Sequence, residues 1–389
     1  MKINVIGGGI FGVTAALELQ NRGHQVAVFE KGTLPEPKAS STDISKMIRA
    51  DYGADELYTN MMVEAFEGWH RWNRIFSRPR YHEVGFLLLT REPPLSGTFE
   101  AESIRMLSQK GFPLVHLDEK ILSGRFPLWN REIYRGGYFN PKAGWAESSA
   151  IVSELVTLGK KEGVQFIENE GLESFIFKNE EVAGFQSNTG NKHLADLTIL
   201  TAGTWSQHLL PDLKTLIKTI GQPVFHLLPE NSRLFSAETF PGWAADISKT
   251  GWYGFPAQPN GIVKIANHGV GFEKLPDADA EIPTHYFEAL RIFLETSLPA
   301  LAPAPVVHTR VCMYADTFDG NFLIDRHPIF ENLLLATGGS GHGFKFAPVL
   351  GNLIADVAEG KTNIFAPRFA WREPGEITFE AARCADPVF

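Results

Sequence analysis

Three glycines at a fixed spacing near the N-terminus are the first residues of this chain whose types could do chemistry. They read Gly7-x-Gly9-x-x-Gly12 and lie between an expected strand, residues 3–6, and an expected helix, residues 10–22. Glycine there allows a tight turn, close backbone approach to a pyrophosphate and close packing of helix on strand, while the helix N-terminus supplies N–H groups. The pattern predicts a dinucleotide site.

An acidic residue follows at the distance that a dinucleotide site requires. Glu30 ends an expected second strand, residues 25–30, where its carboxylate can accept ribose hydroxyls. The motif alone does not separate FAD from NAD, and an acidic residue here argues against the 2′-phosphate of NADP. The dinucleotide contacts expected in this part of the chain are Gly7, Gly9, Ile10, Phe11, Gly12, Glu30, Lys31, Ser41 and Thr42.

A second glycine run, Gly338-Gly-Ser-Gly-His-Gly343, precedes an expected helix at residues 346–357. Its N–H groups and the helix dipole can face a group on which negative charge accumulates. An esterase elbow is excluded, because the residue two after Ser340 is His342 and not glycine. The twelve histidines show no metal-ligand spacing, so we expect no metal.

The glycine run stands close to Cys312-Met-Tyr314 and Asn321-Phe-Leu-Ile-Asp325-Arg-His-Pro, and together these motifs resemble the monomeric sarcosine oxidase group of flavin-dependent amine oxidases. The resemblance covers nearly the whole chain to about Ala366. It implies FAD as the cofactor, and the cysteine of the Cys-Met-Tyr motif forms a thioether to the flavin in that group. Covalent FAD through Cys312 is therefore expected. Further implied flavin contacts are Gly339, Gly341, Gly343, Phe344 and Lys345.

The resemblance also assigns roles around the substrate. Arg49 and Lys345 match the pair that clamps a substrate carboxylate, a task that suits a guanidinium and an ammonium. Lys264 matches the lysine that promotes reaction of reduced flavin with O2, where a fixed cation stabilises developing negative charge. The implied catalytic residues are Lys264, His268, Arg49, Lys345, Tyr253, Tyr314, His342 and Lys46. A regular strand at residues 261–268 would hold Lys264 and His268 about 13 Å apart on one face.

Lys46 departs from the sarcosine oxidase pattern, which has arginine at this position, and Asp43-x-x-Lys46 is similar to fungal fructosyl amino acid oxidases. His342 matches sarcosine oxidase, whereas those deglycating enzymes have arginine. We expect an FAD-dependent oxidase of a secondary or N-substituted amino acid that releases H2O2. A fructosyl amino acid oxidase or a carrier-linked amine dehydrogenase stays open, as does a flavin-binding subunit with a structural or electron-relay role.

The elements that must position these residues form a discontinuous pattern. A helix is expected at residues 148–162, a strand at 164–167, and an antiparallel meander at 172–178, 182–186 and 193–201. We therefore expect an α/β fold: a Rossmann-like FAD-binding domain, with a parallel sheet and a meander, and an α+β substrate domain on a mainly antiparallel sheet. The expected boundaries are 1–80, 147–220 and 325–366 for the first, 81–146 and 221–324 for the second, and 367–389 for a tail.

Composition excludes several other classes. The chain has 389 residues, with 36 Lys and Arg against 45 Asp and Glu, so its net charge is −9 and we expect no nucleic-acid or membrane partner. Cys312 and Cys384 lie in no CxxC pattern, so neither a disulfide framework nor a zinc cluster is expected. Residues 3–17 imitate a secretory signal, but glycines 7–9 break its helix. We expect a cytoplasmic monomer that meets a small amine or amino acid and O2.

Overall fold

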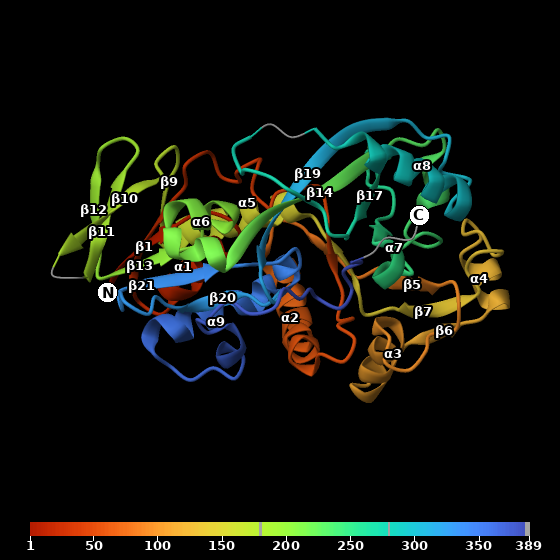
Figure 1. Ribbon diagram of the computed structural model, residues 1–389, viewed down its shortest axis with the longest axis horizontal. Helices are drawn as coiled ribbons and strands as arrows, with labels where there is room; N and C mark the ends of the chain where they lie inside the picture. The colour runs from red at the N-terminus through yellow and green to blue at the C-terminus, as the bar shows by residue number, and fades with distance from the viewer. Residues whose placement is uncertain (179–180, 279–280, 386–389) are drawn as a thin grey trace.

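A parallel sheet and a larger, mainly antiparallel sheet lie side by side in the computed structural model, which describes residues 1–178, 181–278 and 281–385 (Figure 1). This confirms the predicted fold class. The parallel sheet has the order β20-β21-β13-β1-β2-β9, in which only β20 runs antiparallel to its neighbour. Its strands are β1 (Lys2–Ile6), β2 (Gln25–Phe29), β9 (Gln165–Ile167), β13 (Leu197–Leu200), β20 (Leu323–Arg326) and β21 (Leu333–Thr337).

Alternation along the strands gives this sheet two apolar faces. Leu334 and Ala336 of β21 face the helices, whereas Leu333 and Leu335 face the opposite side. On the helical side α1 (Ile10–Asn21) packs between α5 (Ser148–Lys161) and α9 (Ala347–Glu359), and α2 (Glu56–Ile75) packs on α9. The predicted helices 10–22, 148–162 and 346–357 are confirmed within two residues at either end.

The antiparallel meander covers the other face of the parallel sheet. It consists of β10 (Leu172–Lys178), β11 (Glu181–Ser187) and β12 (Lys192–Leu194), and Val182 and Phe185 are buried against the sheet. The expected single strand 193–201 is wrong: the chain breaks after β12 and enters the parallel sheet as β13. Asp196 marks the break, because its carboxylate accepts a hydrogen bond from the backbone N–H of Lys2 at 2.7 Å.

The larger sheet has the order β18-β14-β17-β16-β15-β5-β7-β6, with β19 paired along β14. Every pairing in it is antiparallel except β15 with β5. Its strands are β5 (Phe86–Thr90), β6 (Val115–Leu117), β7 (Gly136–Asn140), β14 (Ile217–Leu227), β15 (Gly242–Ala245), β16 (Trp252–Gly254), β17 (Val263–Asn267), β18 (Phe272–Glu273) and β19 (Val306–Thr317). Its core is aromatic: Trp243 and Trp252 stack on Phe293 of α8 (Thr284–Ser297).

A small antiparallel sheet, β3-β8-β4, joins the two halves. It contains β3 (Lys46–Ile48), β8 (Gly144–Ala146) and β4 (Tyr81–His82), and the chain passes from β4 to β5 of the larger sheet through Gly85, whose φ is +90°. The remaining helices are α3 (Phe99–Gln109), α4 (Glu119–Arg125), α6 (Ser206–Leu209), α7 (Ile247–Thr250) and 3₁₀ turns at Gly203–Trp205, Pro211–Thr215, Ser232–Phe235, Gly343–Phe346 and Ala366–Phe369. The domain boundaries stay a prediction.

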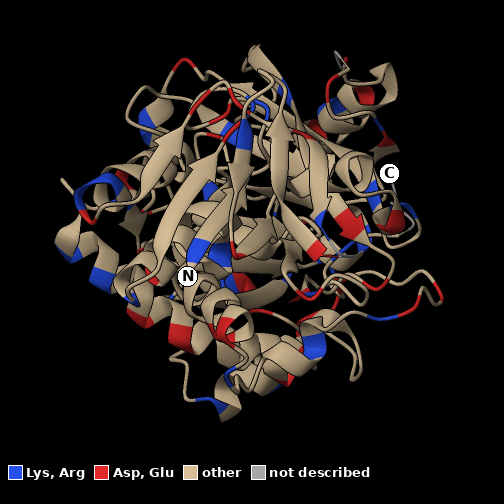
Figure 2. Ribbon diagram, turned by 90° about the vertical axis from the view of Figure 1, so that its left-hand side faces the viewer, with Lys and Arg blue, Asp and Glu red and all other residues tan. Residues whose placement is uncertain are grey.

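Charge is mixed along the described ribbon, where basic and acidic segments are interspersed over both sheets and the helices (Figure 2). Within the described ranges no helix combines the length and apolarity needed to cross a bilayer.

Candidate active site

A large cavity of about 570 Å³ opens where the carboxyl ends of β1, β2, β13 and β21 meet. It contains most of the residues that the sequence assigned to a dinucleotide. Those that line it are Gly7, Gly9, Ile10, Phe11, Glu30, Lys31, Ser41, Cys312, Gly339, Gly341, Gly343 and Phe344, and Lys46 and Tyr314 join them.

The glycine turn and its neighbours build one wall of the large cavity. Gly7 has a φ of +106°, and a Cβ on Gly12 would stand 2.0 Å from the carbonyl oxygen of Gly7, so only glycine permits this approach of α1 to β1. Ser41 comes from a distant loop, and its Oγ accepts a hydrogen bond from the backbone N–H of Ile10 at 2.9 Å. Gly12 and Thr42, although expected as contacts, do not line the cavity.

Glu30 stands at the end of β2 as expected. Its carboxylate accepts hydrogen bonds from the backbone N–H groups of Gly8, at 2.8 Å, and Gly32, at 3.2 Å. Burial raises the pKa of Glu30, and these N–H groups oppose the rise. The carboxylate is therefore fixed in position at the cavity wall, where it can accept hydrogen bonds from hydroxyl groups of a ligand.

A thiol and an ammonium meet at the other side of the large cavity. Cys312 lies on β19, is buried, and its Sγ is 3.2 Å from the Nζ of Lys46 on β3. Lys46 lines both the large cavity and a smaller one of about 60 Å³ beside it. The Lys46 ammonium therefore donates a hydrogen bond to the sulfur at the cavity wall.

The smaller cavity collects nearly all the residues implied as catalytic. Its walls include Lys46, Arg49, Tyr253, His268, Tyr314, His342 and Lys345, from β3, β16, β17's C-terminal end, β19 and the second glycine run. Both cavities share Lys46, Tyr314, Gly341 and Phe344, so they adjoin each other. The arrangement joins a dinucleotide-sized cavity to a small chamber with several cationic groups.

Arg49 and Lys345 lie around Tyr52, a residue that the sequence analysis missed. Lys345 Nζ donates to the Tyr52 hydroxyl at 3.0 Å, and the Arg49 guanidinium lies 5.7 Å from the Tyr52 ring centre. Burial and the charge of Arg49 lower the pKa of Lys345 to about 7. The signal available in the sequence was the short separation of Tyr52 from Arg49, which it follows by three residues.

His342 completes this network from the glycine run. Its Nδ1 is 3.0 Å from the Tyr52 hydroxyl and its Nε2 is 3.0 Å from the carbonyl oxygen of Gly320. Burial lowers the pKa of His342 to about 3, so the ring is neutral at pH 7. Because a carbonyl only accepts, we assign the proton to Nε2, and Nδ1 then accepts from Tyr52, which in turn accepts from Lys345.

Lys264 lines neither cavity, in contrast to the other residues implied as catalytic. Its Nζ donates to the carboxylate of Asp43 at 2.6 Å and to the carbonyl oxygen of Ser45 at 2.5 Å. Burial lowers its pKa to about 8, and the charge of Asp43 limits this shift. His268 lies one residue beyond β17, so a regular strand does not separate the two residues as expected.

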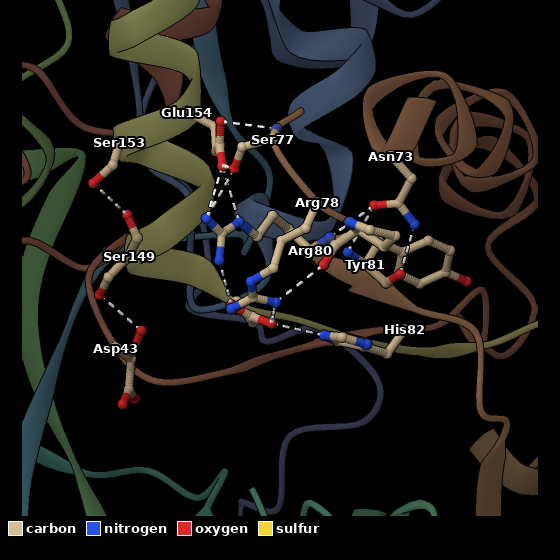
Figure 3. A network of polar contacts seen from close by, with 12 residues as sticks. Asp43, Asn73, Ser77, Arg78, Arg80, Tyr81, His82, Ser149, Ser153 and Glu154 are labelled. Atoms are coloured by element: carbon tan, nitrogen blue, oxygen red, sulfur yellow. Dashed lines mark hydrogen bonds and ion pairs between the residues drawn. The ribbon is translucent and has the colours of Figure 1, made fainter. Parts of the chain in front are cut away.

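Asp43 is held in place by the start of α5. Figure 3 shows the Ser149 hydroxyl donating to the carbonyl oxygen of Asp43 at 2.8 Å, beside a network in which Arg80 pairs with Glu154 at 2.7 Å. Ser148 makes a second hydrogen bond to the same carbonyl oxygen at 2.8 Å. The backbone before Lys46 is therefore fixed from outside the cavities.

Glu380, from the tail that the sequence left unassigned, is the acidic side chain of the smaller cavity. One oxygen accepts from His268 Nε2 at 2.8 Å, and the other is 3.3 Å from Arg49 Nη2. Burial opposes ionisation, but the hydrogen bond from His268 and the charge of Arg49 hold the pKa of Glu380 well below its usual range. No residue pattern in the tail marked this position.

No three His, Cys, Asp or Glu side chains gather as a metal site in the part of the chain that the structure describes.

Arg49 also donates to the carbonyl oxygen of Asp51, whose carboxylate accepts from Tyr138. The chemistry available in the chamber comes from guanidinium, ammonium, imidazole and phenol groups and from the carboxylate of Glu380.

A family model described as FAD dependent oxidoreductase matches residues 2–357 of the chain. N-methyl-L-tryptophan oxidase of Salmonella dublin is 29% identical over 369 residues, covering 93% of this chain and 95% of that protein. L-saccharopine oxidase of Schizosaccharomyces pombe is 26% identical over 421 residues, covering 98% and 95%.

A solved structure shows the same fold. The deglycating enzyme fructosamine oxidase (Amadoriase II) from Aspergillus fumigatus superposes with a TM-score of 0.84 at 26% identity, covering 95% of this chain and 89% of that chain. Sequence and structure comparisons therefore agree over nearly the whole length.

Proposed function

The chain belongs to the FAD-dependent oxidoreductase family, and from that premise we propose that it oxidises secondary or otherwise N-substituted amino acids. The observation that carries this proposal is the smaller cavity, where Arg49 and Lys345 stand near the neutral groups of His268, Tyr253 and Tyr314. A cationic pair suits a carboxylate, and neutral groups suit an amine that must lose its proton. The relative named N-methyl-L-tryptophan oxidase supports the same substrate class.

The residues of the large cavity fit FAD. A volume of about 570 Å³ is within the range of small-molecule sites, and the N-terminus of α1 and Glu30 offer partners for a pyrophosphate and a ribose. Gly7, Gly9, Glu30, Cys312 and Gly339 would be among the residues that hold it, with Cys312 as the proposed covalent link. Bound FAD would accept two electrons as the C–N bond becomes an imine and pass them to O2, giving H2O2.

The substrate carboxylate would bind between Arg49 and Lys345. The Arg49 guanidinium is kept charged by its surroundings, since the charges of Glu380 and Asp51 outweigh burial and raise its pKa. Trp69 donates to the carbonyl oxygen of Lys345 at 2.9 Å, which fixes the backbone that carries the ammonium. These contacts set the distance between the carboxylate and the reacting end of the substrate.

The amine would lie toward His268 and the tyrosines. Burial lowers the pKa of His268 and so favours its neutral form, which presents no positive charge to the amine. The rings of Tyr253 and Tyr314 lie 6.5 Å and 5.9 Å from the His268 ring and exclude water from that side. The unprotonated amine then has its lone pair available when the neighbouring C–H bond breaks, and water hydrolyses the released imine.

The proposal is tested by mixing FAD-loaded protein with N-methylglycine, N-methyl-L-tryptophan and fructosyl-glycine. An N-methyl amino acid should bleach the flavin absorbance without O2 and release H2O2 in air. Preference for fructosyl-glycine would favour a deglycating oxidase, a possibility supported by the likeness to fructosamine oxidase. Bleaching without H2O2 release would indicate a carrier-linked dehydrogenase, and a flavin that none of the three bleaches would contradict the proposal.

The pKa of Lys345 predicts how ligand binding depends on pH. Because its pKa is about 7, Lys345 is charged below pH 7 and neutral above it. Propionate is a carboxylate without an amine, and its binding should therefore weaken by up to about tenfold for each pH unit above 7. Calorimetric titration between pH 6 and 9 measures this slope, and Lys345→Met should flatten it. An unchanged slope in the variant would remove Lys345 from the clamp.

A further inference from the structure

The C-terminal strap, defined here as residues 372–384, crosses the smaller cavity between two anchors. Before the cavity, Arg372 pairs with Asp319 at 2.6 Å, and after it Arg383 pairs with Asp316 at 2.5 Å. The strap ends at Cys384, whose Sγ donates to the carbonyl oxygen of Lys249 in α7 (Figure 1). The strap thus bridges the parallel-sheet half and the larger sheet directly above the proposed substrate chamber.

Between its anchors the strap is exposed except for Glu380 and Ala382. Residues 373–379 and Ala381 are exposed, whereas the Glu380 side chain is only 6% exposed and projects into the cavity. Thr378 holds the strap through one backbone hydrogen bond, from its N–H to the carbonyl oxygen of Phe318 at 2.8 Å. A mostly exposed segment that inserts only Glu380 into the cavity can move locally while its anchors stay in place.

The inserted carboxylate occupies the position that the proposed function gives to the substrate. Glu380 contacts Arg49 at 3.3 Å and His268 at 2.8 Å, and the charge of Lys345 also favours its ionised form. Arg49 is the cation of the proposed clamp. A second carboxylate at this guanidinium would lie beside Glu380 in a buried site, where like charges repel strongly.

The space left beside Glu380 is small. The cavity of about 60 Å³ has room for roughly four to six water molecules at about 10–15 Å³ each. Withdrawal of the Glu380 side chain enlarges this space and removes the competing charge from Arg49.

We propose that Glu380 is a specificity-determining residue that competes with ligands for the clamp, so that only a ligand whose carboxylate can replace that of Glu380 gains the site. This inference rests on the proposed function of Arg49 and Lys345. Substrate binding moves the exposed part of the strap outward while the pairs of Arg372 and Arg383 stay formed. The observed affinity of a carboxylate is then its intrinsic affinity reduced by the fraction of open strap.

The test measures propionate binding to the FAD-loaded holoenzyme by calorimetry. Glu380→Gln should bind propionate with a Kd lower by about tenfold, because the competing charge is gone. The matched control is Glu376→Gln, which removes the same charge from an exposed position of the strap and should leave the Kd unchanged. Propionamide, the neutral counterpart, should bind equally to all of these proteins.

Glu380→Ala repeats the test without an amide that could still contact Arg49. An unchanged Kd in both Glu380 variants would overturn the inference and leave Glu380 a structural residue. A higher Kd in these variants would also overturn the inference, since Glu380 would then hold the ligand. Hydrogen exchange adds a second readout: saturating propionate should accelerate exchange at Thr378 and leave Cys384, whose N–H donates to the carbonyl oxygen of His268 at 3.0 Å, unchanged.

Propionate is not turned over, so this result is independent of the proposed reaction. If no N-substituted amino acid reduces the flavin but Glu380→Gln still tightens propionate binding, the proposed function fails and the competition stands. If turnover occurs and the Kd does not change, the inference alone fails.

Discussion

Replacing Cys312 by serine is expected to give a protein that still takes up FAD but releases all of it on acid precipitation, whereas the unmodified chain keeps its colour in the pellet. Cys312 is buried at the wall of the large cavity, and its Sγ lies 3.2 Å from the Lys46 ammonium. A thiol so placed faces a ligand in that cavity and can form a thioether to it. Serine keeps the shape but lacks this reactivity.

The matched control for this prediction is Cys384→Ser. Cys384 is equally buried, but its Sγ donates to the carbonyl oxygen of Lys249 at 3.0 Å and it lines neither cavity. Its replacement should leave the colour in the pellet. Lys46→Met should slow covalent incorporation, measured as pellet absorbance after mixing unloaded protein with FAD. Colour that leaves the unmodified protein in acid would remove Cys312 from this role and keep FAD as a dissociable ligand.

Local signals predicted the dinucleotide half of the fold well. The turn from Gly7 to Gly12, its flanking strands and Glu30 lie within one continuous segment, and each residue type there has a backbone or packing reason. The helix at 148–161 follows from apolar residues at helical spacing, among them Ile151 and Leu155, which are fully buried. Short-range patterns suffice where the partners are close in sequence.

Contacts between distant segments were beyond the same reasoning. Whether residues 193–201 form one strand or two depends on the hydrogen bond between Asp196 and the first strand, which no local pattern contains. The expected role of Lys264 at the flavin stays a prediction, and its ion pair with Asp43, far away in the sequence, lies in no local pattern. Glu380 belongs to an irregular tail, and only the folded structure brings it to Arg49.

Tyr52 illustrates an intermediate case. It lies three residues after Arg49, so its proximity to the clamp was implicit in the sequence, but its role depends on bonds to Lys345 and His342 from the other end of the chain. The hydrogen-bond chain explains why the neutral ring of His342 lies beside two basic side chains, because its Nδ1 accepts a hydrogen bond from the Tyr52 hydroxyl. Residue type alone does not reveal such a relay.

The largest catalytic effect is expected at Arg49. Arg49→Lys should lower kcat/KM for an N-methyl amino acid by about 10²- to 10³-fold, or roughly 3–4 kcal/mol, the loss typical of truncating one partner of a buried charged pair. The guanidinium is buried among the rings of Tyr52, Phe86 and Phe99 at 5.6–5.9 Å, and lysine cannot reproduce its planar fork. Lys345 cannot compensate, since a pKa of about 7 leaves it half neutral at pH 7.

Steady-state kinetics together with thermal unfolding separate this effect from a loss of folding. The matched control is Arg80→Lys, which weakens partly buried pairs with Glu147 and Glu154, residues that line neither cavity, and should leave kcat/KM unchanged (Figure 3). An amine without a carboxylate should react equally poorly with Arg49→Lys and the unmodified enzyme, because neither uses the clamp for it. If Arg49→Lys retained its kcat/KM while folding normally, the substrate carboxylate would have to bind elsewhere. Glu380 would then not compete with the substrate for Arg49.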